Sequence, residues 1–565
     1  MSDTRDLNLG KALIKNNIID EKQLNQAYEY IKKQNEAGRW TTLSQALLES
    51  AFVKETDILK ILGAQYNIPF IDLVETDISK DTLKLISGRL AKEHNIIPVK
   101  RDGNQLILAM SDPFNYIALD DAKRFSGLNI HQVLAGSTDI LEAIEKFYAG
   151  ESTQKYSAAL KEEYQNLSVN ELPGISEGDI SGAPVVLLVD STIKQAFKTH
   201  ASDIHIEPME TDMRVRFRID GQLQEVMRQS LSASAAIVTR IKIMAGMDIA
   251  EKRLPQDGRI AMDIDGQSVD MRISTLPTVY GEKVEIRLLG LGKDAEYTRK
   301  SLGFIRENNA LFDRLLKSPH GIILVSGPTG SGKTTTLYTA LLELNKVSRN
   351  IITVEDPVEY KLEGINQVHV NQKAGLTFAT GLRSILRQDP DIIMIGEIRD
   401  SETAQIAMRA AITGHLVLST IHTNDAASAI ARLMDMGIET YIAASSLVGV
   451  VAQRLVRKIC PRCRSEYQPD DYEKMMFNLS DGEFLYKGKG CPACNHTGYS
   501  GRIAVHEILI VNKEIKGLIS ENASAEVIKD RATQLGMIPL KDGGVYLAKA
   551  GVTTAAEVIS MSYSV

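Results

Sequence analysis

The spacing of apolar and polar positions divides the chain into parts with different periods. Over residues 1 to about 73, leucines recur at helical spacing, and two stretches, "NLGKALIKNNIIDEKQL" and "TLSQALLESAFVKETDIL", carry them at matching offsets. This similarity indicates a duplicated helical unit. Strand-like runs such as "NIIPV" and "QLILAM" follow, with a helix expected to end near "AIEKFYAG". Residues 1–149 are therefore predicted to form an N-terminal helical plus α/β domain.

A polar stretch over residues 150–183 ends in Gly, Ser and Pro, and we interpret it as a linker with one short helix. Residues 184–300 combine an amphipathic helix, "PVVLLVDSTIKQAFKTH", with alternating strands. One pair of these strands reads as a hairpin that turns at Asp220-Gly221. This pattern predicts a second, α+β domain.

From Gly321 onward the strand-like runs change character. "GIILVSG", "NIITVED", "DIIMIGE" and "HLVLSTI" are apolar throughout instead of alternating, and helical patterns separate them. Parallel strands that are covered by helices on both faces have this pattern. Residues 301–565 are therefore predicted to form an α/β domain around a parallel sheet.

Composition and charge narrow the function. The 565 residues are 44% hydrophobic and 24% charged, with a net charge of −7 and no block of Lys and Arg. A DNA translocase or helicase is disfavoured, because contacts to phosphates require a basic surface. The start, "MSDTRDLNLG", lacks the features of a signal peptide, and "YIAASSLVGVVA" is shorter than the roughly 18 residues of a membrane span. We expect a cytoplasmic protein.

The segment "SGPTGSGKTTTLY" matches the phosphate-binding loop G-x-x-x-x-G-K-[ST], between an apolar strand and a helix. Its glycines allow backbone N–H groups to wrap phosphates, while Lys333 would reach the outer phosphates and Thr334 would offer its hydroxyl to Mg²⁺. The predicted nucleotide-binding residues are Gly327, Pro328, Thr329, Gly330, Ser331, Gly332, Lys333, Thr334 and Thr335.

Hydrolysis also requires groups that orient water and hold the metal. Glu355 in "TVEDPVEY" and Glu397 in "DIIMIGEIRD" each end an apolar strand, where a parallel sheet presents its site. His415 and His422 bracket the run "HLVLSTI", and their separation does not require them to touch the same atom. His422, beside Thr423 and Asn424, is a candidate sensor of the terminal phosphate. The two glutamates, Glu355 and Glu397, argue against a regulatory protein that binds a nucleotide without hydrolysing it.

All four cysteines lie in two Cys-x-x-Cys pairs, Cys460 with Cys463 and Cys491 with Cys494. Two complete pairs with none left over favour a metal over a redox pair, and four thiolates suit tetrahedral Zn²⁺. His496 is a spare candidate ligand. We predict a structural Zn²⁺ in an insert over residues 456–500, because four thiolates leave no open position for chemistry.

Several segments together resemble the secretion ATPases of type IV pilus assembly and type II secretion, the PilB/GspE/PulE family. "GPTGSGKTTTLY", "ITVEDPVEY", "DIIMIGEIRD" and "TGHLVLSTIHTND" are similar to its Walker A, Asp, Walker B and His boxes, and "ASDIHIEP" and "EKRLPQDGR" are also typical. The resemblance implies an α/β fold with a RecA-like P-loop ATPase domain, preceded by a PAS-like α+β domain. It also implies ATP as the nucleotide.

The resemblance implies roles for individual residues. Glu355 is similar to the water-activating glutamate of the family, and Glu397 to its Walker B glutamate, which acts on Mg²⁺. The residue types agree with both roles but do not assign them. Arg259 and Arg272 best match arginines that the family directs toward the nucleotide from the preceding domain, with Arg287 next. Such cations would couple nucleotide state to domain angle.

The resemblance also implies partners and location. Family members form homohexameric motors on the cytoplasmic side of the bacterial inner membrane, where they act through a platform protein of PilC/GspF type and an adaptor of PilM/GspL type. The main prediction is a motor for pilus extension. A type II secretion or DNA-uptake motor of the same family is the alternative, and the N-terminal domain together with the cysteine pairs favours extension.

The N-terminal region resembles the MshE N-terminal type, in which a doubled motif binds cyclic di-GMP in some members. Here Asn8-Leu9-Gly10 and Thr42-Leu43-Ser44 stand where each copy should carry an arginine. The leucines are then sufficiently explained as helix core. Loss of both guanidinium groups weighs against cyclic di-GMP as a ligand.

Overall fold

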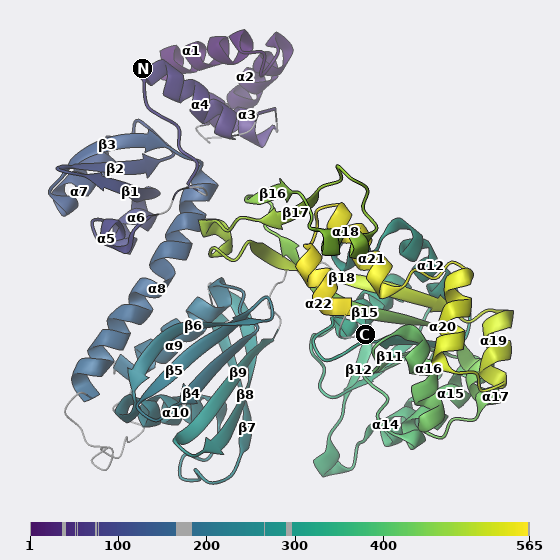
Figure 1. The fold of residues 1–565 in the computed structure, drawn as a ribbon. Helices are drawn as coiled ribbons and strands as arrows, with labels where there is room; N and C mark the ends of the chain where they lie inside the picture. Colours follow the sequence, from purple (N-terminus) through teal and green to yellow (C-terminus); the bar gives the residue numbers. More distant parts are fainter. Residues whose placement is uncertain are drawn as a thin grey trace. The chain divides into compact units, whose positions relative to one another are not determined.

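The structure is a computed structural model that describes residues 2–36, 41–50, 52–53, 55–73, 76, 78–164, 184–264, 266–289 and 297–562. The chain divides into two compact units. The first comprises residues 1–260, 272–287 and 491–493, and the second comprises residues 261–271, 288–490 and 494–565. Both units combine helices with sheets (Figure 1).

Four helices form the start of the first unit: α1 (Ser2–Lys15), α2 (Glu21–Glu36), α3 (Leu43–Glu49) and α4 (Glu55–Tyr66). Thr42 begins α3 with a capping box, in which its side chain accepts from the backbone N–H of Gln45. Leu9, Leu13, Leu43 and Leu47 are buried in the core of these helices. Leucines of both sequence copies therefore pack into one core.

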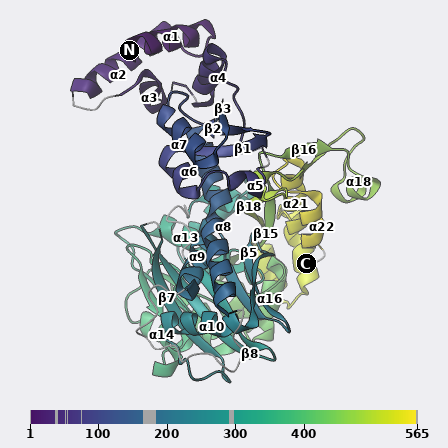
Figure 2. The same ribbon diagram turned by 90° about the vertical axis from the view of Figure 1, so that its left-hand side faces the viewer.

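A small sheet with its own core follows, with strands β1 (Ile96–Asp102), β2 (Gln105–Met110) and β3 (Asn129–Leu134) in the order β1-β2-β3. Strand β1 is antiparallel to β2, and β2 is parallel to β3. Figure 2 shows the sheet with its helices α5 (Lys80–Leu83), α6 (Gly88–His94) and α7 (Tyr116–Ser126).

Helix α8 (Ser137–Tyr164) is longer than the sequence pattern predicted. We expected a helix to end near residue 150, but the helix continues because residues 151–164 contain no proline or glycine to stop it. Leu160 and Ser157 of this extension are buried, and Gln229 donates to the Ser157 hydroxyl over 2.5 Å. The rest of the predicted linker, residues 165–183, lies outside the described residues.

The next domain is built on a six-stranded sheet in the order β6-β5-β4-β9-β8-β7. Its elements are α9 (Pro184–Lys198), β4 (Asp203–Pro208), β5 (Asp212–Ile219), β6 (Gln222–Ser230), α10 (Leu231–Ala245), β7 (Gln256–Ile264), β8 (Gln267–Thr278) and β9 (Gly281–Leu289). The predicted hairpin is confirmed: Ile219 pairs with Gln222, and Asp220 and Gly221 between them both have positive φ, 48° and 84°.

The two faces of this sheet differ. Ile204 and Ile206 of β4 meet apolar residues of α9 and α10 on one face. The alternate residues Asp203, His205 and Glu207 are buried on the other face. There Arg216 forms a bidentate ion pair with Glu207, with both N–O distances 2.8 Å, and Arg287 lies 2.8 Å from Asp203. The second face is thus lined by paired charges.

The second unit is built on a seven-stranded sheet in the order β12-β11-β13-β14-β10-β15-β18. Its strands are β10 (Gly321–Ser326), β11 (Ile351–Glu355), β12 (Asn366–His369), β13 (Ile392–Ile395), β14 (Leu416–Ile421), β15 (Leu447–Ile459) and β18 (Tyr499–Ile510). Neighbouring strands are parallel except for β15 and β18. The four apolar runs are entirely buried, which confirms the predicted parallel sheet.

Helices cover this sheet. They are α11 (Arg299–Leu302), α12 (Arg306–Leu316), α13 (Lys333–Leu344), α14 (Phe378–Ile385), α15 (Ser401–Ile412), α16 (Ala426–Asp435), α17 (Thr440–Ser446), α19 (Lys513–Ser520), α20 (Ala525–Gln534), α21 (Leu540–Lys549) and α22 (Ala555–Ser562). Between β15 and β18 the chain forms β16 (Arg464–Tyr467), α18 (Asp471–Phe477) and β17 (Leu485–Gly488). Over the described ranges, every helix is too short or too polar to cross a lipid bilayer.

His506 of β18 lies inside this unit. It is 3% exposed, and its ring packs against Phe304 with centroids 4.1 Å apart. Within the described ranges, its Nε2 has no hydrogen-bond partner. Burial lowers the pKa of His506 to about 3, so the imidazole is neutral at physiological pH.

His506 should make the second unit sensitive to acid. The unfolded chain takes up this proton near pH 6.5 and the folded chain only near pH 3, so the free energy of unfolding should fall between these values as pH decreases. The slope contributed is at most about 1.4 kcal/mol per pH unit. Replacing His506 by Phe should flatten the loss of stability measured between pH 7.5 and pH 5. His320→Gln, at an exposed histidine, is the control. An unchanged pH dependence in H506F would contradict this.

Candidate active site

The phosphate loop connects the end of β10 at Ser326 to the start of α13 at Lys333. Gly327, Gly330 and Gly332 all have positive φ, at 149°, 77° and 87°. A Cβ on Gly327 would lie 2.6 Å from the backbone oxygen of Gln453, so no larger residue fits there. The loop thus reaches the N-terminus of a helix, where N–H groups and the helix dipole favour an anion.

Lys333 lies within this loop. Its Nζ donates to the backbone oxygens of Gly327 at 2.8 Å and Pro328 at 2.9 Å. Burial lowers the pKa of Lys333 to about 8, and the charge of Arg454 lowers it further while Glu397 opposes the shift. Thr334 and Thr335, at the start of α13, are exposed.

Glu355, the last residue of β11, is 3% exposed and holds a fixed position. Its Oε2 accepts from the Tyr338 hydroxyl at 2.6 Å, and its Oε1 accepts from Thr353 at 2.6 Å and from Gln367 at 3.1 Å. Burial raises the pKa of Tyr338, and Glu355 reinforces the shift, so this phenol remains a donor. The carboxylate of Glu355 is therefore oriented by three donors.

Glu397 follows β13 at the same edge of the sheet. Its carboxylate lies 2.6 Å from Arg399 and 3.5 Å from Nε2 of His422, which follows β14. Burial lowers the pKa of His422, with a further contribution from Lys333, so the ring is neutral at pH 7. The structure thus brings Glu397, His422 and the phosphate loop to one edge.

His415 lies elsewhere. It precedes β14, and its backbone oxygen accepts from Gly321 at the start of β10. Its Nδ1 is 3.0 Å from the oxygen of Ala410. Because β10 and β14 are parallel, this position is at the edge opposite the phosphate loop. The two histidines that bracket β14 therefore do not meet.

Gln453 and Arg454 of β15 support the loop and were not selected from the sequence. Gln453 is fully buried, donates to the backbone oxygen of Ser331 at 2.6 Å and accepts from the Thr336 hydroxyl at 2.7 Å. Arg454 is 6% exposed and donates to Asn424 at 3.0 Å. The sequence signal was available, since "VVAQRLV" places two polar residues inside an apolar run.

Arg259 and Arg272 line a hollow of about 410 Å³ in the first unit, together with Arg287 and the acids Asp257 and Glu285. Their approach to a nucleotide stays a prediction. Arg287 is already paired with Asp203 and Glu285, so Arg259 and Arg272 are the cations of this hollow that could meet an anion.

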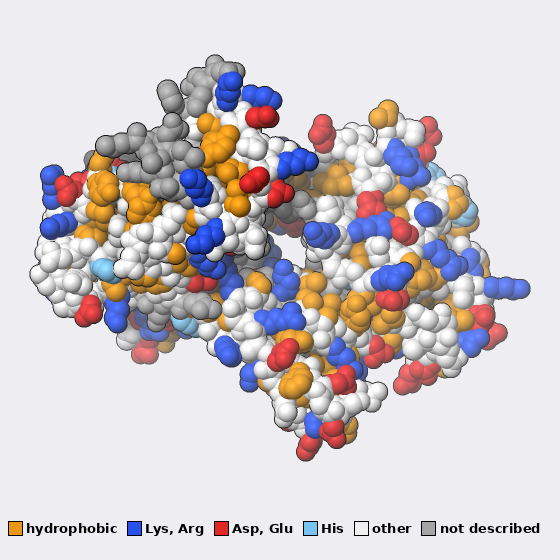
Figure 3. All heavy atoms as spheres, turned by 90° about the horizontal axis from the view of Figure 1, so that it is seen from above, with side chains coloured by type: hydrophobic (Ala, Val, Ile, Leu, Met, Phe, Trp, Pro, Cys, Tyr) orange, Lys and Arg blue, Asp and Glu red, His pale blue; other side chains and the backbone are white. Residues whose placement is uncertain are grey.

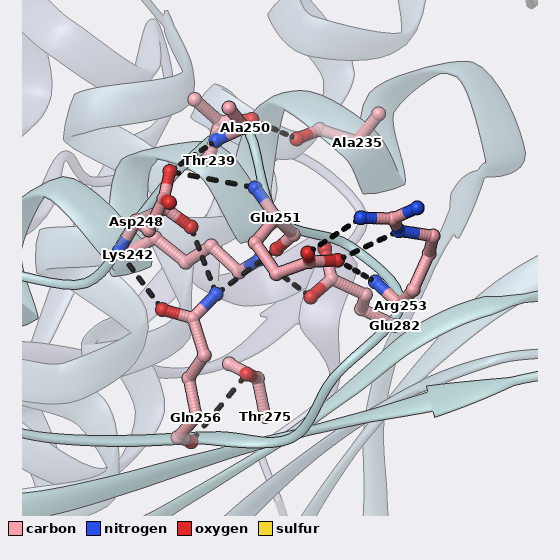
Figure 4. Close-up of polar contacts among 10 residues, drawn as sticks. All are labelled: Ala235, Thr239, Lys242, Asp248, Ala250, Glu251, Arg253, Gln256, Thr275 and Glu282. Atoms are coloured by element: carbon pink, nitrogen blue, oxygen red, sulfur yellow. Dashed lines mark hydrogen bonds and ion pairs between the residues drawn. The ribbon is translucent and has the colours of Figure 1, made fainter.

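The segment that leads into β7 and Arg259 is fixed by polar contacts (Figure 4). Buried Lys242 donates to the Glu251 oxygen at 2.7 Å and lies 2.5 Å from Glu282. Gln256 exchanges two hydrogen bonds with the backbone of Asp248, both 2.8 Å. The start of β7 is therefore held by hydrogen bonds to the segment that precedes it.

Cys460, Cys463, Cys491 and Cys494 lie together, with their sulfur atoms all within 4.8 Å of one another. The sulfurs of Cys463 and Cys494 are 3.9 Å apart, and Gly498 donates its N–H to the sulfur of Cys494. Thiolates on a tetrahedral Zn²⁺ at about 2.3 Å would be roughly 3.8 Å apart. The cluster thus fits zinc, which these four residues would hold in a structural role.

A mostly parallel sheet with a phosphate loop and two strand-end glutamates at its carboxyl edge is the arrangement of a P-loop ATPase of RecA-like fold. A solved structure supports the fold: the ATPase DotB of Legionella pneumophila has a TM-score of 0.50 at 18% identity, covering 67% of this chain and 96% of that one. The chain belongs to the Type II/IV secretion system protein family, whose profile matches residues 179–560. Residues 66–154 match the MshEN domain.

Curated relatives agree with this membership. The type IV pilus assembly ATPase PilB of Myxococcus xanthus is 44% identical over 98% of both chains. PilB of Pseudomonas aeruginosa is 38% identical over 97% of both chains. The type II secretion system ATPase E of Vibrio cholerae is 50% identical, over 67% of this chain and 76% of its own length. The chain is thus an ATPase of the secretion family.

Lys333 should make nucleotide binding depend on pH. A bound phosphate chain would raise the lowered pKa of Lys333 again, so binding between pH 8 and 9 should take up part of a proton. The dissociation constant of MgADP should rise across this range, by at most about tenfold per pH unit. Calorimetry in buffers of different ionisation enthalpy measures the uptake. Lys333→Arg, whose guanidinium does not titrate here, should abolish it; equal uptake by both proteins would count against Lys333.

The cysteine cluster should hold one Zn²⁺ per chain. Elemental analysis of purified protein should find close to one equivalent, and Cys491→Ser should lose most of it together with thermal stability of the insert, because metal binding contributes to folding. His496→Ala is the control and should keep its zinc. Fully folded, metal-free protein recovered from zinc-replete cells would refute the site.

Proposed function

We propose that this chain is an ATP-hydrolysing motor that powers pilin polymerisation in type IV pilus assembly. The observation that carries the proposal is the match to pilus assembly ATPases over 98% of both chains, with the phosphate loop and both glutamates at one sheet edge. The phosphate loop and the two glutamates at one edge support a working motor over a passive nucleotide sensor.

The roles of the two glutamates follow from their surroundings. A carboxylate offers about four acceptor positions, and Glu355 uses three of them for Tyr338, Thr353 and Gln367. About one position remains, in a fixed direction, and this suits a single attacking water. Glu397 contacts Arg399 and lies near Lys333, so we assign it to Mg²⁺ together with Thr334.

We further infer that residues 184–300 form a PAS-like domain that moves against residues 301–565 during the ATP cycle. The six-stranded sheet with α9 and α10 on one face supports this assignment. Arg259 and Arg272 would contact the terminal phosphate of ATP, which ADP lacks, so the two nucleotides would favour different domain angles. His422 would sense the same phosphate, whereas His415 supports the opposite edge of the sheet.

The proposed assembly is a homohexamer at the cytoplasmic side of the inner membrane. It would act on a platform protein of PilC/GspF type, with an adaptor of PilM/GspL type. Basic and acidic side chains are interspersed among those seen in Figure 3, and the net charge of −7 agrees with protein partners and not with nucleic acid. Residues 66–154 match the MshEN domain, and the doubled motif that would bind cyclic di-GMP precedes this range; the arginines missing at Asn8 and Thr42 weigh against binding.

A type II secretion motor is the second candidate. Its support is the 50% identity to the type II secretion ATPase of Vibrio cholerae, which is higher than the identity to the PilB chains. That match spans 67% of this chain, whereas the match to PilB of Myxococcus xanthus spans 98%. Coverage of the N-terminal region therefore favours pilus assembly.

Deletion of the gene should remove surface pili and leave type II secretion intact. A copy carrying Glu355→Gln should not restore pili, because only water activation is lost: MgATP should bind within about threefold of wild type while turnover falls roughly 10²-fold or more. Glu363→Gln, at an exposed glutamate outside the site, is the control and should restore both.

The possible outcomes separate the assignments. Wild-type turnover by E355Q would transfer the water-activating role to Glu397. Normal pili in the deletion strain, with lost secretion, would replace the pilus proposal by the type II alternative.

A further inference from the structure

Strand β15 contacts two parts of the active site through neighbouring residues. Ser326, the last residue of β10, pairs with Ala452, so Gln453 and Arg454 lie just beyond β10, beside the phosphate loop. Side chains of successive strand residues point to opposite faces. Gln453 accordingly reaches Ser331 and Thr336, while Arg454 reaches Asn424, in the segment that follows β14.

Arg454 is an unusual arginine. It is 6% exposed, and its Nε has no hydrogen-bond partner among the residues that the structure describes. None of the ion pairs found within the described part of the chain includes it, although Asp425 and Glu507 act on its charge from a distance. A buried guanidinium normally needs a carboxylate partner. Here its shortest contact is a bond of 3.0 Å to the amide oxygen of Asn424, and a longer bond of 3.4 Å reaches the backbone oxygen of Gln453. The bond to Asn424 is thus the principal side-chain contact of Arg454.

Arg454 contacts the segment that runs from His422 to Ala426. The C-terminal end of this segment is held by several bonds, whereas its N-terminal end is not. Asp425 pairs with Lys529 at 3.0 Å and caps α16 through Ser428, and the N–H of Ala426 donates to buried Glu507 at 2.9 Å. At the N-terminal end, His422 is half-exposed, and its Nε2 lies 3.5 Å from the carboxylate of Glu397. Asn424 lies between the two ends.

We propose that Arg454 is a positioning residue for ATP hydrolysis, which holds Asn424 so that His422 stays against Glu397 at the edge that carries the phosphate loop. Together with Gln453 it forms a direct connection from that loop to the His422 segment. Movement of the loop would then move His422 as well. The inference rests on hydrolysis at this site and adds two residues, Arg454 and Asn424, to those that control it.

The test compares Arg454→Gln and Arg454→Lys with wild type. Arg454→Gln should lower kcat by about 100-fold, as expected for displacement of an active-site group, while the KM for MgATP stays within about threefold. Arg454→Lys keeps the charge and should recover part of kcat. Arg409→Gln, at an exposed arginine of α15, should behave as wild type.

A double-mutant cycle with His422→Ala identifies the route. If Arg454 acts through His422, the double variant should be no slower than the slower single variant, within about twofold. Multiplied effects would overturn the proposal, as would a raised KM with unchanged kcat.

Amide exchange gives a readout apart from activity. With MgADP bound, residues 422–428 should exchange faster in Arg454→Gln than in wild type, while residues 327–334 should not change. Equal exchange over 422–428 would also overturn the proposal. The exchange measurement tests the contact between Arg454 and Asn424 independently of pilus assembly. A failure of the wild-type protein to support pili would count against the proposed function and not against this contact.

Discussion

Parallel pairing of β10, β11, β13 and β14 is the constraint on which the active site depends. Parallel strands end at one edge, so the phosphate loop, Glu355, Glu397 and His422 come together although other elements separate them in sequence. An antiparallel arrangement would place half of these groups at the opposite edge, where His415 lies. Because helices cover both faces of this sheet, its strands are mostly apolar, and the groups that carry the chemistry occur where the strands end.

Polar groups behind this edge are buried, and nearly all of them are paired. Glu355 meets three donors, Gln453 binds on both sides of its amide, and Thr420 donates to the Gly396 oxygen at 2.7 Å. In a medium of low dielectric constant such bonds are strong, but each unpaired member is costly. The network therefore favours a single arrangement of the edge, and removal of one partner should disturb several others.

Much of the fold was predictable because the relevant signals are local. The apolar runs, the turn at Asp220-Gly221 and the phosphate loop are each contained in a few neighbouring residues. The helix at 137–164 was predicted too short, because Gly150 and the polar residues after it resemble a linker, while the buried contact of Ser157 with Gln229 is not visible in sequence.

The residues that support the site were not predictable in the same way. Gln453 contacts Ser331 across 122 positions, and Tyr338 contacts Glu355 across 17, and both contacts arise only once the strands are paired. The cysteines were found because tetrahedral ligation imposes a recognisable spacing. The position of His415 follows only from the direction of β14.

The cysteine insert joins two strands that are already neighbours. Strands β15 and β18 are antiparallel and pair from Gly449–Ile510 to Ile459–Tyr499, and residues 460–498 connect their ends. A metal bound to all four cysteines would tie the two ends of this long connection together and shorten the effective loop, which reduces the entropy lost on closing it. Since Phe477 and Leu485 of the same connection are buried in the core of the second unit, such a metal would also keep this part of the core in place.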